Sequence, residues 1–283
     1  MQGVLYIVGT PIGNLSDFSP RAVETLDMVD FIAAEDTRVT MKLLNHFQIK
    51  KPLVSYYEHN KLERGQMILD RILAGESCAL VSDAGMPAIS DPGELLVAQC
   101  AEAGVQVLAV PGPSAVISAL AISGLPTGRF TFEGFLSVNK KSRREHLADV
   151  KNEQRTMVFY EAPHKLSATL HDMLTAWGDR KIAIVREITK IHEEVIRTTL
   201  AEADARFQTE APKGEIVLVI SGAEAPAEET FTLEDAVQTA KEFWSKECPP
   251  PKQQKKPRSF AALKKEKSIE SYSDDLLLEK TSR

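Results

Sequence analysis

The sequence lacks the features that mark membrane-spanning, secreted or disulfide-linked proteins. No apolar run reaches the roughly 18 residues that a membrane helix needs, so we expect no membrane partner. The first eight residues enter an apolar segment without the basic leader of a signal peptide. The three cysteines, Cys78, Cys100 and Cys248, are far apart, fit no zinc-binding spacing and are odd in number. We therefore predict a cytoplasmic protein without a disulfide framework.

The common phosphate-binding and nucleophile motifs are also missing. There is no G-x-x-x-x-G-K-[ST] loop and no G-x-G-x-x-G turn after the first apolar segment, which argues against P-loop and dinucleotide-binding proteins. A G-x-S-x-G nucleophile turn is absent as well. The six histidines are scattered without metal-ligand spacing, so we predict no metal site.

The net charge is −6, because 40 aspartates and glutamates outnumber 34 lysines and arginines. The segment 246–267 departs from this average, since it holds eight lysines and arginines against two glutamates. A basic tail of this kind binds nucleic acid or is a solvated terminus, and the sequence leaves both interpretations open. We expect residues 224–283 to form one helix near 232–244, followed by a disordered tail rich in proline and lysine.

Short apolar segments alternate with helical patterns over most of the chain, which predicts an α/β fold with two domains. In residues 1–124 the expected strands are 3–8, 31–34, 53–56, 78–82 and 105–110. Helical patterns separate them, so the sheet should be largely parallel. A break at 125–128 begins the second domain, residues 125–223, with expected strands at 130–136, 156–160, 181–186, 195–199 and 215–221. Two of these, 181–186 and 195–199, are expected to pair in antiparallel fashion.

Polar loops rich in glycine and proline follow the predicted strands of the first domain. They cover 9–15, 35–38, 56–60, 82–93 and 111–115. Because parallel strands bring their carboxyl ends to one edge of a sheet, we expect these loops to meet there. The loop 82–93 contains Asp83 together with two glycines and two prolines, which restrict the backbone to few conformations. Asp83 is therefore a candidate ligand-binding residue, with a simple turn cap as the alternative.

These loops resemble those of the class III S-adenosylmethionine methyltransferases, the family named for its tetrapyrrole methylases. The matching segments are 9–15, 34–38, 58–60, 82–93, 111–115, 132–136, 159–164, 186–190 and 213–215, in order over residues 3–222. Glu-Asp-Thr-Arg at 35–38, Glu-His-Asn at 58–60 and Glu-Ala-Pro-His at 161–164 are similar to the branch that methylates ribosomal RNA.

The resemblance implies two α/β domains of the tetrapyrrole methylase type, with S-adenosylmethionine in the cleft between them. It implies cofactor contacts from Pro11, Asp83, Gly85, Pro87, Ile89, Ser114, Ala115, Glu161, Pro163 and Gly214. It further implies methylation of a cytidine 2′-hydroxyl in the decoding region of 16S rRNA, on the 30S subunit, by a homodimer. A tetrapyrrole C-methyltransferase of the same fold and a non-catalytic RNA-binding assembly factor are the alternatives.

Methylation of a ribose hydroxyl requires alignment of the oxygen and removal of its proton. The candidate bases lie on the loops after the second and third strands and are His59, Glu58, Asp36 and Glu35. His59 has the most suitable intrinsic pKa, although a structural hydrogen bond or a phosphate contact would explain it equally well.

RNA contacts are predicted for a set of cationic and polar side chains. They are Arg38, Asn60, Lys140, Lys141, Arg143, Arg144, His164 and Lys165. For the cluster at 140–144 an exposed helix start is the alternative, and for Asn60 a helix cap. The chain departs from the family after residue 248, where relatives end in a small helical unit, and this departure bears on RNA binding more than on donor binding.

Overall fold

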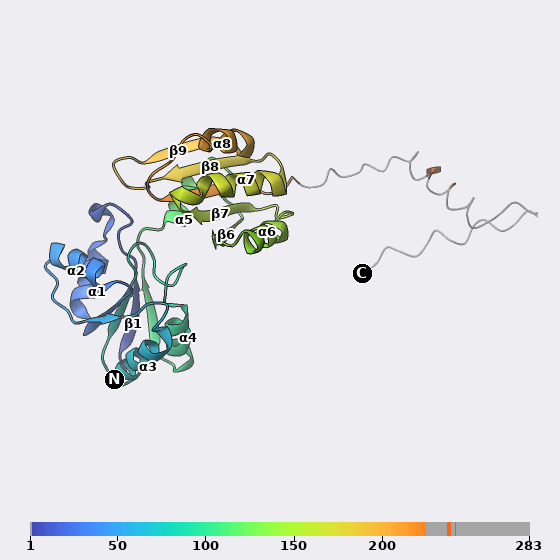
Figure 1. Cartoon of the computed structure of the whole chain (residues 1–283). Coiled ribbons are helices and arrows are strands. Elements are labelled where there is room, and N and C mark those ends of the chain that lie inside the picture. Colours follow the sequence, from blue (N-terminus) through green and yellow to red (C-terminus); the bar gives the residue numbers. More distant parts are fainter. Residues whose placement is uncertain (1, 225–236, 239–240, 242–283) are drawn as a thin grey trace, which may run out of the picture. The chain divides into compact units, whose positions relative to one another are not determined.

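The computed structural model of the chain describes residues 2–224, 237–238 and 241 (Figure 1). Two units are distinguished, Met1–Pro226 and Ala227–Arg283, and the features below belong to the first. The basic tail and Cys248 lie outside the described residues, as does most of the helix predicted at 232–244. No helix in the described ranges is long and apolar enough to cross a membrane.

The first sheet is entirely parallel, whereas the sequence predicts a largely parallel one. Its strands are β1 (Val4–Val8), β2 (Phe31–Ala34), β3 (Leu53–Ser55), β4 (Cys78–Val81) and β5 (Gln106–Val110), in the order β3-β2-β4-β1-β5. Every residue of β2 and β4 is buried. These two inner strands therefore read as continuous apolar runs, which is typical of a parallel sheet covered on both faces.

Helices cover both faces of this sheet because successive strand residues point to opposite sides. Leu80 contacts the core formed with α3 (Lys61–Leu73) and α4 (Glu94–Glu102). The neighbouring Ala79 and Val81 contact the core formed with α1 (Pro20–Met28) and α2 (Thr37–His46). Ser19 caps α1 by accepting a hydrogen bond from the backbone N of Ala22, and Pro20 occupies the first helical position.

The second sheet is mixed. Its strands are β6 (Phe130–Phe135), β7 (Thr156–Glu161), β8 (Lys181–Arg186), β9 (Glu194–Thr199) and β10 (Ile216–Ile220), in the order β6-β7-β10-β8-β9. Only β6 and β7 run parallel, and the predicted antiparallel pairing of β8 with β9 is confirmed. The helices α6 (Lys140–Asp149), α7 (Leu166–Trp177) and α8 (Leu200–Phe207) follow its strands, and α7 and α8 supply much of one core.

The helix α5 (Ala115–Ile122) follows the last strand of the first sheet but packs on the second. Val116, Ala119 and Leu120 share a core with residues of β7, β8 and β10. From β9, the Arg197 guanidinium donates hydrogen bonds to the backbone oxygens of Ser123, at 3.1 Å, and Ile122, which end this helix. The boundary at residue 124 stays a prediction, yet by its contacts α5 belongs with the second sheet.

Candidate functional site

The loops that follow β1, β4 and β5 are in direct contact. The backbone N of Thr10 donates to the oxygen of Gly85 at 2.9 Å, and the N of Gly85 donates to the oxygen of Thr10 at 3.1 Å. Gly9 and Gly112 lie so close that a Cβ atom on either would come within 2.8 Å of the backbone of the other. Three of the five predicted loops thus converge through their backbones, and this approach requires glycine.

Carboxylates connect the loop after β2 with the loop after β4. The backbone N of Asp36 donates to Oδ1 of Asp83 at 3.1 Å, and the N of Asp83 donates to Oε2 of Glu35 at 3.5 Å. Burial, followed by the negative charge of Asp83, raises the pKa of Glu35. Burial also raises the pKa of Asp83, and the charge of Asp36 adds to this effect. The cluster holds more negative charge than its own protein partners neutralise.

Asp91 belongs to the same cluster, although the sequence reasoning did not single it out. Its pKa is raised to about 6 by burial first and then by the charge of Glu35, against a hydrogen bond from Ser82. The signal available in the sequence was its position in the loop 82–93, eight residues after Asp83. Nothing in the spacing, however, indicated that its half-buried side chain lies near Glu35.

Asp36 and Arg38 form a pair on the first turn of α2. Asp36 caps the helix by accepting a hydrogen bond from the backbone N of Arg38 at 2.8 Å, and its Oδ2 lies 2.6 Å from Nη2 of Arg38. These bonds lower the pKa of Asp36 to about 2. Asp36 therefore remains ionised and accepts a proton poorly, which argues against its predicted role as a base.

The loop after β3 is shaped by Asn60. Its Oδ1 accepts a hydrogen bond from the backbone N of Tyr57 at 2.8 Å, and its Nδ2 donates to the oxygen of Ser55 at 3.2 Å. Its side chain thus holds this loop rather than capping α3. Glu58 pairs with Lys61, and His59 is exposed with its ring beside Tyr57. Among the described interactions, no hydrogen bond joins this loop to the carboxylate cluster.

The predicted cofactor residues of the second domain lie at the ends of β7 and β10. The carboxylate of Glu161 is buried, where it accepts hydrogen bonds from Oγ1 of Thr169 and the backbone N of Ala162. Gly214 has φ +89°, and a Cβ atom there would lie 2.2 Å from Oε1 of Glu187. Pro163 begins a 3₁₀ turn, Pro163–Lys165, that carries His164 and Lys165 and directly precedes α7.

The loop 82–93 reaches the second sheet. Oγ of Ser90 lies 3.8 Å from the position of a Cβ atom on Gly134 in β6. Burial raises the pKa of Tyr160 in β7, and the charge of Asp91 contributes. Ser90 and Ala88 both adopt left-handed backbone conformations, with φ of +64° and +67°. Ser90 and Asp91 of this loop therefore lie near β6 and β7 of the second sheet, and the binding of a donor between the two sheets stays a prediction.

The basic cluster on α6 divides into buried and exposed members. Nε of Arg143 donates to Oδ2 of Asp172 on α7 at 2.8 Å, and the two side chains are only 12% and 5% exposed. Arg144 also contacts Asp172 but is 56% exposed, and Lys141 is 85% exposed. This burial argues against the predicted RNA contact of Arg143, because its guanidinium joins α6 to α7. Lys140, Lys141 and Arg144 remain accessible.

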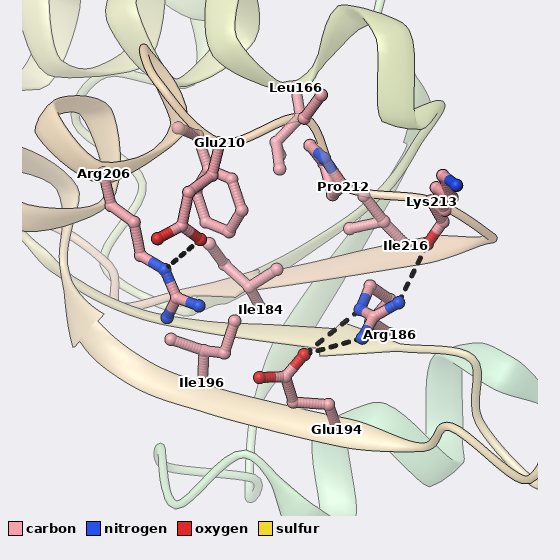
Figure 2. A pocket seen from close by; sticks show the side chains of 12 residues that line it. Leu166, Ile184, Arg186, Glu194, Ile196, Arg206, Glu210, Pro212, Lys213 and Ile216 are labelled. Atoms are coloured by element: carbon pink, nitrogen blue, oxygen red, sulfur yellow. Dashed lines mark hydrogen bonds and ion pairs between the residues drawn. The ribbon is translucent and has the colours of Figure 1, made fainter.

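A separate hollow of about 300 Å³ lies where α8 ends above β8 and β9 (Figure 2). Ion pairs between Arg186 and Glu194 and between Arg206 and Glu210 flank an apolar floor that includes Ile184 (Figure 2). None of the residues predicted for catalysis or for the cofactor lines it. Within the described part of the chain, no group of three or more His, Cys, Asp or Glu side chains is placed to hold a metal ion.

Comparison with known proteins identifies the family. A relative from Synechocystis sp., named ribosomal RNA small subunit methyltransferase I, is 53% identical over 235 residues, which are 83% of this chain and 84% of the relative. A relative of the same name from Thermotoga maritima is 52% identical over 223 residues, 79% of this chain and 100% of the relative.

The fold agrees with that of solved methyltransferases. The uroporphyrin-III C-methyltransferase of Thermus thermophilus, complexed with S-adenosylhomocysteine, superposes with a TM-score of 0.55 at 18% identity, over 77% of this chain and 97% of that one. Diphthine synthase superposes with a TM-score of 0.56 at 12% identity, over 77% and 89%. The family of tetrapyrrole (corrin/porphyrin) methylases matches residues 4–204. The predicted fold and S-adenosylmethionine cofactor are thereby confirmed, and the chain belongs to the tetrapyrrole methylase family.

Proposed function

We propose that this protein transfers a methyl group from S-adenosylmethionine to the 2′-hydroxyl of a cytidine in the decoding region of 16S rRNA. The single observation that carries the proposal is the identity of about half of all residues to relatives named as small-subunit rRNA methyltransferases, over four-fifths of the chain. We further propose that it acts in the cytoplasm, as a homodimer, on the 30S subunit.

The carboxylate cluster fits the charge of the donor. S-adenosylmethionine carries a sulfonium and an ammonium group but no phosphate, so it needs negative rather than positive partners. The charge of Asp83 contributes to the raised pKa of Glu35, and the charges of Glu35 and Asp83 contribute to that of Asp91, so a cation placed among these carboxylates would relieve the repulsion. When bound, the donor supplies an electrophilic methyl group, and the protein's own residues orient the acceptor and take its proton.

The geometry distinguishes among the predicted bases. Asp36 is held ionised by Arg38, whereas burial raises the pKa of Glu35 and so makes its carboxylate the stronger base of the two. We therefore favour Glu35 as the base on the β2 loop. His59 and Glu58 stay predictions, because His59 is exposed and Glu58 pairs with Lys61.

The proposed RNA contacts outside the cleft come from exposed cations. Lys140, Lys141 and Arg144 lie along the exposed face of α6 and line a shallow depression there. They offer a surface for the phosphate backbone, which requires positive charge but no base-specific geometry.

The proposal is tested by incubating the protein with radiolabelled S-adenosylmethionine and, separately, 30S subunits lacking the modification and uroporphyrinogen. We expect label in 16S rRNA, at a cytidine whose 3′-phosphodiester bond resists alkaline hydrolysis because its 2′-oxygen is methylated. Label only in the tetrapyrrole would support the C-methyltransferase. Calorimetry without detectable donor binding would support the non-catalytic assembly factor.

A further inference from the structure

A hollow of about 310 Å³ opens between the β1 loop and α2, beside the carboxylate cluster. Leu15 lines it from the β1 loop, and Val39 and Leu43 line it from α2. Ser82 and Asp83 lie at the end nearest to β4, whereas Lys42 and His46 belong to the last two turns of α2. Its volume is at the small end of the range for ligand pockets.

This hollow adjoins the predicted donor site without coinciding with it. Of the ten residues predicted to contact the donor, only Pro11 and Asp83 line it. None of its lining residues comes from the second sheet or from α5, whereas Glu161 ends β7, Ser114 precedes α5 and Gly214 precedes β10. An in-line methyl transfer requires the acceptor to approach from the side opposite the donor's sulfur, so a cavity sharing one wall with the donor site is suitably placed for the acceptor.

The lining has the chemistry of a nucleobase pocket. Leu15 and Val39 expose 45% and 38% of their surface, and a flat aromatic base would cover these apolar side chains. At the inner end, Oδ1 of Asp83 already accepts a hydrogen bond from Asp36, which orients the carboxylate. Its other oxygen suits the exocyclic amine of cytosine or adenine and would repel the carbonyl oxygen of uracil. Lys42 provides a positive charge for a phosphate on the flanking backbone.

We propose that this hollow binds the nucleobase of the methyl-accepting nucleotide and selects a base with an exocyclic amine. The proposal rests on the proposed function, since it supplies the binding site for the substrate of that reaction. The target nucleotide would leave its base stack to enter the hollow, as enzymes that modify nucleotides commonly require.

The test introduces a bulky side chain into the hollow from α2. In Val39→Trp the new ring occupies the space between α2 and the β1 loop. We expect kcat/KM for 30S subunits to fall at least tenfold, while the Kd for S-adenosylmethionine measured by calorimetry stays within twofold. Met41→Trp is the matched control, because Met41 is on the same helix, is 45% exposed and does not line the hollow. It should leave both values unchanged.

Two results would overturn the proposal. Val39→Trp with wild-type kcat/KM would show that the hollow stays empty during the reaction. A tenfold loss of donor affinity in Val39→Trp alone would assign the hollow to the donor instead.

A wild-type protein without activity on 30S subunits would contradict the proposed function, and nucleotide binding then decides the inference separately. Cytidine and uridine monophosphates are titrated into wild-type and Val39→Trp protein saturated with S-adenosylhomocysteine, with NMR detection. Binding of the cytidine nucleotide to wild type alone, at least fivefold tighter than the uridine nucleotide, supports the nucleobase site. Equal chemical-shift changes in the two proteins on addition of the cytidine nucleotide refute it.

Discussion

At the scale of single residues, the site is dominated by carboxylates that have few positively charged partners. Asp36 is neutralised by Arg38, but Glu35, Asp83 and Asp91 face one another in a partly buried place. Such groups bind protons more tightly in the folded protein than in the unfolded chain. Repulsion among these carboxylates therefore lowers the stability of the ligand-free protein at neutral pH. The same negative charge provides an anionic site for a cationic ligand.

Asp91 provides the first prediction at this scale. Its pKa of about 6 exceeds the ordinary value of 3.8, so the folded state binds the extra proton between about pH 4 and pH 6. Stability from this group consequently rises as the pH falls through 6 and is lowest above it. We expect Asp91→Asn to raise the free energy of unfolding by about 1 kcal/mol at pH 7.5, after discounting for solvent screening at this half-buried site.

Urea denaturation from pH 4.5 to 8 measures this effect. The difference between Asp91→Asn and wild type should shrink toward pH 4.5, where the folded wild type carries the protonated carboxyl. The Asp27→Asn variant on α1 is the matched control, because it makes the same replacement at an exposed position. A difference that is constant with pH would show that Asp91 does not titrate in this window.

At the scale of elements, the approach of β1 to β5 depends on a contact between two glycines. Gly9 and Gly112 lie backbone to backbone just beyond the strand ends. The β4 loop is then joined to this pair through the paired bonds of Thr10 and Gly85. The loops of the site are thus held by main-chain contacts and hydrogen bonds that tolerate no added side chain at these two glycines.

Gly112→Ala tests this arrangement. The new Cβ would meet the backbone of Gly9 at 2.8 Å, which forces the strand ends apart. We expect a loss of about 2 kcal/mol in the free energy of unfolding, typical of overpacking, and weaker donor binding by calorimetry. Gly128→Ala is the matched control, since no atom lies within 4 Å of its Cβ position, and it should change stability by less than about 1 kcal/mol. Equal effects of the two substitutions would contradict the close-contact argument.

At the scale of the whole molecule, a chain of net charge −6 is proposed to bind a polyanion. This is possible only if local cations outweigh the average field, and the exposed face of α6 is such a place. The neighbouring cations of this helix differ in their surroundings. Lys141 extends into solvent, whereas Arg143 binds Asp172 beneath the helix.

Lys141→Ala and Arg143→Ala should therefore affect different quantities: the first changes the salt dependence of 30S binding, and the second changes stability. Lys141→Ala should reduce the slope of log Kd against log salt for 30S binding by about 0.7 to 0.9, the value of one phosphate contact, with unchanged stability. Arg143→Ala should leave the slope unchanged and cost about 2 kcal/mol of unfolding free energy, because Arg144 still partners the buried Asp172. Filter binding over a salt series and urea denaturation measure the two quantities. A slope that falls equally in both variants would refute the assignment of an RNA contact to Lys141 and a structural role to Arg143.

Most of the fold was predictable from local pattern. The predicted strands 31–34 and 181–186 begin and end where β2 and β8 do, because each is an apolar stretch next to polar or turn-forming residues. The position of α5 was not predictable, since its apolar surface fits either sheet and only the packing of Val116 and Leu120 decides between them. Likewise, the spacing of 140–144 reveals a basic cluster but not that Arg143 faces Asp172.

Residue type and order along the chain were enough to specify the strand-helix alternation, the loops at the strand ends and the family. Which loop side chains share a site depended instead on the folded arrangement. Asp91 joins Glu35, Asn60 folds its own loop, and Asp83 faces a hollow beside α2. Burial, electrostatic repulsion and cavity shape depend on contacts between residues far apart in the chain. Local sequence patterns do not reveal which of these residues come into contact.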